Sequence, residues 1–248
     1  MTKNSLAIAG ANRLADEFLA VARENDFEPI HCDARTAIPA TMSSLIDTES
    51  GTAEKKRALL EHFEAALPPS CVIITSCLRL TVTEIASWLK RPERVVGFAT
   101  FYPLKDRRLI ELTAGLRTAE SALAQAEQLF KSLGKDTVRV KDSPGLTFPR
   151  ILSLIINEAA RSLEEGVASA EEIDIAMRLG VNYPQGPLKW ADQIGLDEVL
   201  AVLDGLHGAT GDDRYRAAPL IRKLVGAGFL GETSGRGFYT YTEGQVKP

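Results

Sequence analysis

The stretch Asp142–Tyr241 is the most informative part of the chain, because apolar segments alternate along it with residues typical of turns. In chain order its segments are DSPG at Asp142–Gly145, ILSLIINEAARSLEEG at Ile151–Gly166, AEEIDIAMRLG at Ala170–Gly180, YPQGPLKWADQIG at Tyr183–Gly195 and TSGRGFY at Thr233–Tyr239. Apolar residues recur at helical spacing, and no segment shows the alternation of a strand. The stretch therefore predicts a domain of short helices.

Local signals place individual helix ends within this stretch. Ser169 and Glu172 have the spacing of a capping box, which predicts that a helix begins at Ala170. Gly180 is expected to be the left-handed residue that ends this helix. Pro187 suits the first turn of the next helix, where its missing N–H costs nothing.

The segment from 151 to 163 is apolar on most of its faces, which predicts a helix buried within its domain or between subunits. Its apolar residues are Ile151, Leu152, Leu154, Ile155, Ile156, Ala159, Ala160 and Leu163. One interpretation makes it the centre of its own domain, and the other makes it a subunit interface. The helices that follow are short and broken by glycine and proline, so they cover it poorly. We therefore expect a homodimer formed through the helical domain.

The N-terminal part has the order of a dinucleotide-binding unit. An apolar strand, Leu6–Ala9, ends at Gly10, a helical pattern follows, and a second strand ends at Asp33. Asp33 lies 23 residues beyond Gly10, close to the usual interval of about 20 for the acid that binds a ribose. The glycine pattern falls on Gly10, Asn12 and Ala15. Because glycine at the second position lets the pyrophosphate approach the backbone, Asn12 predicts weak or absent binding of NAD.

Composition and charge exclude several classes of protein. The apolar fraction of 45% is enough for a full core, and the net charge of −4 favours neither nucleic acid nor an anionic membrane as partner. No apolar run approaches the length of a membrane span, and no signal-peptide layout is present. Cys32, Cys71 and Cys77 lack metal-ligand spacing. We therefore expect free thiols, no metal site and a cytoplasmic location.

Together these motifs resemble the 3-hydroxyacyl-CoA dehydrogenase family of fatty acid metabolism. The resemblance implies an α/β Rossmann-like NAD-binding domain over residues 1–141 and an all-α domain over residues 142–248. It also implies NAD as cofactor, an acyl-CoA as substrate and pairing through the helical domain. In the family, a helical hairpin that reaches over the substrate follows the ribose-binding acid. Here only residues 34–44 separate Asp33 from the next strand pattern, which puts acyl-CoA binding in question.

The resemblance also implies where catalysis is carried out. The family uses a histidine as base, a glutamate that orients it, and a serine and an asparagine that bind the substrate's oxygens. The histidine position is Ala99, the serine position is Leu78 and the asparagine position is Pro149, so Glu111 alone is retained. Alanine exchanges no proton, leucine makes no hydrogen bond, and proline lacks an amide N–H.

These substitutions favour a dehydrogenase-like protein that is catalytically inactive or strongly impaired. The alternative is a working NAD-dependent 3-hydroxyacyl-CoA dehydrogenase, which oxidises a 3-hydroxyacyl-CoA to a 3-ketoacyl-CoA. A second alternative is a ligand-binding or regulatory subunit.

Overall fold

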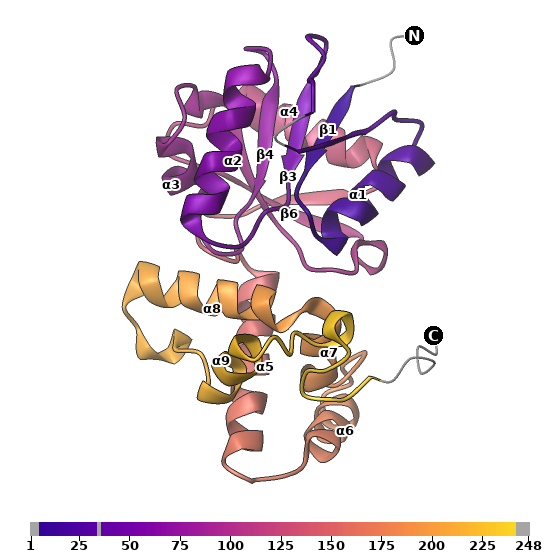
Figure 1. Cartoon of the computed structure of the whole chain (residues 1–248), viewed down its shortest axis with the longest axis vertical. Coiled ribbons are helices and arrows are strands. Elements are labelled where there is room, and N and C mark those ends of the chain that lie inside the picture. The colour runs from indigo at the N-terminus through magenta and orange to yellow at the C-terminus, as the bar shows by residue number, and fades with distance from the viewer. Residues whose placement is uncertain (1–4, 34–35, 242–248) are drawn as a thin grey trace. The chain divides into compact units, whose positions relative to one another are not determined.

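The computed structural model describes residues 5–33 and 36–241 and divides into two compact units, residues 1–147 and 148–248. Figure 1 shows an α/β unit followed in the chain by an entirely helical one. This is the predicted fold class, an α/β Rossmann-like domain followed by an all-α domain. The division lies six residues later than the boundary suggested by the sequence, after residue 141. Residues 142–147 belong to unit 1, where the Asp142 carboxylate accepts the N–H groups of Val82 and Thr83.

Unit 1 is built on a seven-stranded sheet in the order β2-β1-β3-β4-β5-β6-β7. The strands are β1 Leu6–Ala9, β2 Ile30–Cys32, β3 Ser44–Asp47, β4 Val72–Ser76, β5 Val95–Ala99, β6 Leu109–Ala114 and β7 Asp136–Arg139. The helices are α1 Arg13–Glu24, α2 Ala53–Ala66, α3 Val82–Ser87 and α4 Glu120–Ser132, with short 3-10 turns η1 Pro92–Arg94 and η2 Leu104–Asp106. Neighbouring strands run parallel except for β5 and β6, which are antiparallel.

The central strands are apolar on both faces, as expected for a sheet covered by helices on both sides. On one face, Phe18 of α1, Phe98 of β5 and Phe130 of α4 pack against one another, with ring centroids 5.8 to 6.1 Å apart. Leu60 and Phe63 of α2 are fully buried as well. This packing makes the sheet a rigid support for the loops at its edges.

The strand order reverses between β1 and β3. The chain passes from β1 outward to β2 and then returns to the other side of β1, so β1 has β2 and β3 as its neighbours. Such a reversal leaves a crevice at the carboxyl ends of the strands, where open α/β sheets bind ligands. We call this side of the sheet the carboxyl edge; it includes the ends of β1 at Ala9, β3 at Asp47, β4 at Ser76 and β5 at Ala99.

Unit 2 consists of helices that pack around α5. Its elements are α5 Phe148–Glu164, α6 Ala170–Gly180, α7 Pro187–Ile194, α8 Leu196–Thr210, η3 Asp213–Tyr215, α9 Pro219–Gly226 and η4 Glu232–Ser234. The predicted capping box is present, because Ser169 and Glu172 exchange hydrogen bonds at the start of α6. The predicted left-handed Gly180 is wrong: it is the last residue of α6, and Asn182 has the positive φ, 57°. Asparagine tolerates this conformation because its short polar side chain bonds locally.

None of the helices in the described part of the chain is long and apolar enough to cross a membrane.

Candidate functional site

The turn after β1 carries the first residue of the predicted dinucleotide fingerprint. Gly10 has a φ of +126°, and a Cβ added there would lie 2.1 Å from Oγ1 of Thr48. Glycine is therefore required by both conformation and space. Ala15, the third fingerprint position, is fully buried, and its small side chain fits the close packing of α1 on β1. This turn fits a dinucleotide at two of its three fingerprint positions.

Asn12, the second fingerprint position, turns its side chain toward the protein. Its Oδ1 accepts the N–H of Ala15 at 3.0 Å and the hydroxyl of Thr48 at 2.9 Å, and its Nδ2 donates to the Thr48 carbonyl at 2.8 Å. The side chain thus caps α1 and joins the loops that follow β1 and β3. Its amide is held in this network, so the reason for doubting a dinucleotide there is weakened.

His31 lies in β2, and Asp33 directly follows the last residue of this strand, Cys32. The Nε2 atom of His31 lies 2.8 Å from the carbonyl oxygen of Gly10 and so ties β2 to the turn. Oδ1 of Asp33 accepts the hydroxyl of Thr36 at 2.8 Å. The sequence interval therefore reflects a real proximity, because β1 and β2 are neighbours with Ala9 opposite Cys32.

A buried ion pair, which the sequence reasoning missed, lies at the carboxyl edge. Asp47 and Lys56 are 0% and 3% exposed, and Lys56 Nζ lies 2.8 Å from Asp47 Oδ2. The same oxygen accepts the hydroxyl of Thr75 at 2.6 Å, and Lys56 also donates to the Glu49 carbonyl at 2.5 Å. Such charges are tolerated in an interior because they are paired and hydrogen-bonded. The sequence signal that could have indicated this pair is a charged residue, Asp47, at the end of an apolar strand.

Glu49 lies beside this pair in the loop between β3 and α2. Its carboxylate lies 2.7 Å from Nζ of Lys55 and accepts the N–H of Gly51 at 2.9 Å. Burial opposes the charge, but these hydrogen bonds and the two nearby lysines hold the pKa of Glu49 below its ordinary value. Glu49 therefore stays ionised and paired.

Ala99 and Glu111 face each other across the antiparallel strands. The register of β5 and β6 pairs Ala99 directly with Glu111, so their Cβ atoms share one face of the sheet about 5 Å apart. Glu111 is 7% exposed, and its Oε2 accepts the N–H of Thr147 at 2.7 Å. A carboxylate thus lies at the carboxyl edge, opposite the methyl group where the sequence lacks the expected base.

The other substituted positions are filled by apolar side chains. Leu78 is 1% exposed, just beyond the end of β4. Its neighbour Cys77 is fully buried, and this burial raises the pKa of the thiol far above its ordinary value. Pro149 is in the first turn of α5 in unit 2, where its missing N–H costs nothing. Leu78, Cys77 and Pro149 therefore supply no proton acceptor.

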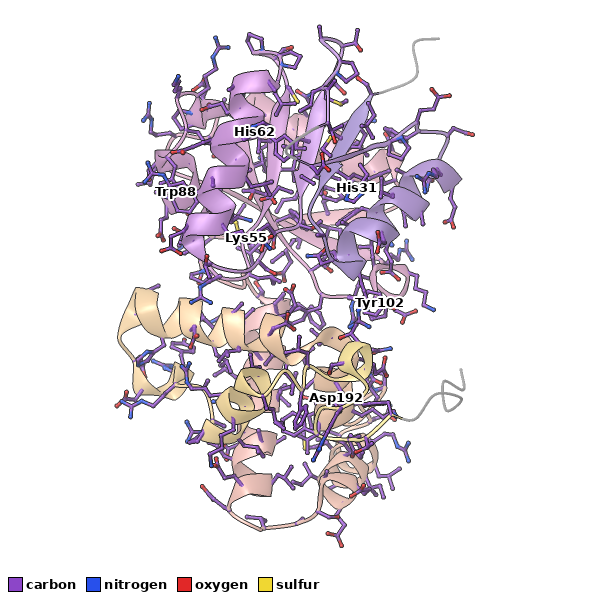
Figure 2. All side chains as sticks on the ribbon, viewed as in Figure 1. His31, Lys55, His62, Trp88, Tyr102 and Asp192 are labelled. Atoms are coloured by element: carbon purple, nitrogen blue, oxygen red, sulfur yellow. The ribbon has the colours of Figure 1, made fainter. Side chains whose placement is uncertain are left out.

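All three histidines of the chain are used elsewhere. His31 contacts Gly10, His62 makes an edge-to-face contact with Phe63 in α2, and His207 lies 3.6 Å from Asp213 in unit 2. Figure 2 shows His31 and His62 on different elements of unit 1. Among the residues that the structure describes, no cluster of histidine, cysteine, aspartate or glutamate side chains is suited to hold a metal ion.

Both parts of the chain match models of known domains. Residues 145–241 match the 3-hydroxyacyl-CoA dehydrogenase C-terminal domain, and residues 24–143 match the NAD-binding domain of the same family. The Gly10 turn precedes the second match. The doubt about NAD that rested on Asn12 is not borne out, because the residues after that turn match an NAD-binding domain and Asn12 keeps its amide in an internal network.

Three relatives illustrate the similarity. A probable 3-hydroxybutyryl-CoA dehydrogenase of Bacillus subtilis is 42% identical over 76% of this chain and 66% of its own length. A 3-hydroxybutyryl-CoA dehydrogenase of Clostridioides difficile is 39% identical over 82% of this chain and 72% of its own length. The crystal structure of (S)-3-hydroxybutyryl-CoA dehydrogenase PaaH1 from Ralstonia eutropha matches 98% of this chain and 100% of its own, with a TM-score of 0.83 and 30% identity.

These relatives contradict the expectation of an inactive or strongly impaired protein, because they are named as specific dehydrogenases at 30 to 42% identity. The expectation was wrong for a physical reason. It assumed that each substituted side chain leaves its role unfilled, although a general base supplies only about 10²- to 10⁴-fold of an enzyme's acceleration. The carboxylate of Glu111 also remains at the carboxyl edge.

Proposed function

Because the chain belongs to the 3-hydroxyacyl-CoA dehydrogenase family, we propose that it is an NAD-dependent dehydrogenase that oxidises a short 3-hydroxyacyl-CoA to the 3-ketoacyl-CoA. The observation that carries the proposal is the 39 to 42% identity to relatives named 3-hydroxybutyryl-CoA dehydrogenase. The position of Glu111 at the carboxyl edge gives this chemistry a proton acceptor.

The residues at the switch between β1 and β3 would hold the cofactor. The Gly10 turn and the first turn of α1 provide the helix N-terminus that favours a pyrophosphate. Asp33 at the end of β2 is the acid for the ribose hydroxyls. NAD supplies the hydride acceptor when it is bound.

We assign proton removal to Glu111 itself, with no histidine between it and the substrate. Loss of the hydroxyl proton and of a hydride converts the C3–OH group to a carbonyl, and the proton needs an acceptor. Asp47 and Glu49 at the same edge are paired with lysines. Glu111 accepts a backbone N–H from Thr147 and lies directly opposite Ala99, the position where the family has its base.

The proposed function is tested by turnover of the whole chain with NAD and 3-hydroxybutyryl-CoA, followed by NADH absorbance. We expect a turnover number of ordinary size for an enzyme, about 1 per second or more. The reverse reaction with acetoacetyl-CoA and NADH serves as the check. Failure to turn over in either direction, by a protein that is folded in solution, would contradict the proposed function.

We also propose that the chain forms a homodimer through unit 2. Among the described residues of this unit, the large apolar side chains that are exposed are Ile151 (53%), Val167 (72%), Ile175 (49%), Leu179 (75%) and Val181 (53%). Leu152 and Ile156, which the sequence suggested for the interface, are buried within the chain instead. The exposed set lies on α5, on α6 and beside them, and a surface of this kind is typical of an interface.

For this dimer, we expect Leu179→Glu to reduce the mass in light scattering at micromolar concentration to that of one chain, 26.9 kDa. The reason is that a charge at an apolar interface loses its hydration without gaining a partner. Leu116→Glu is the control, because Leu116 is 90% exposed in unit 1 and should leave the mass unchanged. A wild-type mass of one chain that does not rise with concentration would contradict the dimer.

The location proposed for the protein is the cytoplasm. Cys32, Cys71 and Cys77 are free and buried. Unpaired thiols of this kind are typical of a reducing compartment.

A further inference from the structure

We propose that Arg13 binds the pyrophosphate of the dinucleotide and that the ring of Tyr102 holds the guanidinium in place for it. This inference rests on the proposed function, because it concerns the cofactor that the reaction needs. It assigns a positive charge to the turn in which Asn12 occupies the second fingerprint position.

Arg13 and Tyr102 form a stacked pair at the carboxyl edge. Arg13 is the first residue of α1 and follows the Gly10 turn by three positions. Its guanidinium carbon lies 4.0 Å from the centre of the Tyr102 ring, well within the range of about 6 Å for a cation–π contact. Figure 2 shows Tyr102 beside the first turn of α1. Both side chains are half-buried.

The loop that carries Tyr102 is fixed to the rest of unit 1. The N–H of Leu104 donates to the carboxylate of Glu17, which lies one helical turn after Arg13 on α1. Lys135, 9% exposed, donates to the carbonyls of Leu104 and Arg107 at 2.8 Å each. The loop that carries Tyr102 is therefore tied to the same helix that presents Arg13.

The chemistry of the stacked guanidinium suits a pyrophosphate. A guanidinium held over a ring by a cation–π contact keeps N–H groups that match two phosphate oxygens. The contact with the ring also restricts the Arg13 side chain before the ligand arrives, so less conformational entropy is lost on binding. A cation in the first helical turn opposes the helix dipole, and a bound anion removes that penalty. The alternative is that the contact between Arg13 and Tyr102 only holds the loop in place. In that case Arg13 does not contribute to binding of the cofactor.

The test is the affinity of the whole chain for NADH, measured by fluorescence titration. We expect Arg13→Ala to weaken NADH binding roughly 10- to 100-fold, as the loss of hydrogen bonds to a charged group implies. Arg13→Lys should fall between, because it keeps the charge and loses the paired geometry. Arg23→Ala is the matched control: Arg23 is exposed in the last turn of the same helix and should leave the affinity unchanged.

Competition with fragments identifies which part of the cofactor Arg13 contacts. We expect Arg13→Ala to weaken ADP as a competitor of NADH and to leave adenosine as it is in the wild type. Tyr102→Leu should lose part of the wild-type affinity, because it removes the ring that supports Arg13, and Tyr102→Phe, which keeps a ring, should lose less than Tyr102→Leu. Thermal unfolding of each variant checks that unit 1 remains folded.

The proposal is overturned by results of two kinds: some concern Arg13 alone, and the other also removes the proposed function. Unchanged NADH affinity in Arg13→Ala, or equal losses for ADP and adenosine, refutes the role of Arg13 and leaves the proposed function standing. Absence of NADH binding by the wild type refutes the proposed function and, with it, this inference.

Discussion

Replacing Glu111 with glutamine is expected to lower kcat about 10²- to 10⁴-fold, which is the usual contribution of a general base. Glutamine keeps the size of the side chain and an oxygen that accepts the N–H of Thr147, the bond seen at 2.7 Å. It cannot take up a proton near neutral pH. The affinity for NADH, measured by fluorescence, should be unchanged, because Glu111 lies on β6 and not at the Gly10 turn.

A control is provided by Glu64, a half-buried carboxylate that also accepts backbone N–H groups, those of Lys90 and Arg91 at 2.8 and 2.9 Å, and that pairs with Arg94 at 3.8 Å. Glu64→Gln removes a negative charge away from the carboxyl edge and should leave kcat within about twofold. If Glu111→Gln turns over as fast as Glu64→Gln, Glu111 does not accept the proton.

The dependence of kcat/KM on pH shows whether Glu111 takes up the proton itself or only positions another group. A base must be deprotonated to act, so kcat/KM rises with pH through the pKa of the base. In peptides a glutamate titrates near about 4.3 and an imidazole near about 6.5. The variant Ala99→His places a ring directly opposite Glu111, and we expect the rising limb of its profile to lie at higher pH than in the wild type. An unmoved limb would show that the new ring does not replace Glu111 as base.

Much of the fold could be predicted from the sequence because its signals are local. The capping box at Ser169 and Glu172, the strand ending at Gly10 and the acid at Asp33 each lie within a few residues of the element that they define. Gly180 failed because the helix continued through it, and the left-handed position passed to Asn182.

The site could be predicted only in part, because its interactions join distant segments. Whether Asn12 obstructs a ligand depends on Thr48, 36 residues away, which accepts and donates the hydrogen bonds that turn the amide inward. The functional prediction was contradicted by the names of the relatives and not by a contact in the fold. The substitution at Ala99 could be read directly, but its pairing with Glu111 depends on the register of β5 and β6.

The buried pair of Asp47 and Lys56 gives the largest stability effect that we expect. Lys56→Met should lower the free energy of unfolding by about 3–5 kcal/mol, because removing one partner leaves an uncompensated buried charge. Asp47 is fully buried, and after the substitution its carboxylate would keep the hydroxyl of Thr75 and the N–H of Glu49 as partners but no cation. Urea denaturation monitored by circular dichroism measures the change.

The adjacent Lys55 offers a control for this prediction within the same helix. Its side chain is 67% exposed and pairs with Glu49 at 2.7 Å, and an exposed pair contributes only about 0–1 kcal/mol. Lys55→Met should therefore change stability by no more than that. The double variant Lys56→Met with Asp47→Leu removes both charges and should recover part of the loss, since a buried pair is often replaced by apolar residues at little cost. Equal stabilities for Lys56→Met and Lys55→Met would mean that the pair is not buried in solution as the structure has it.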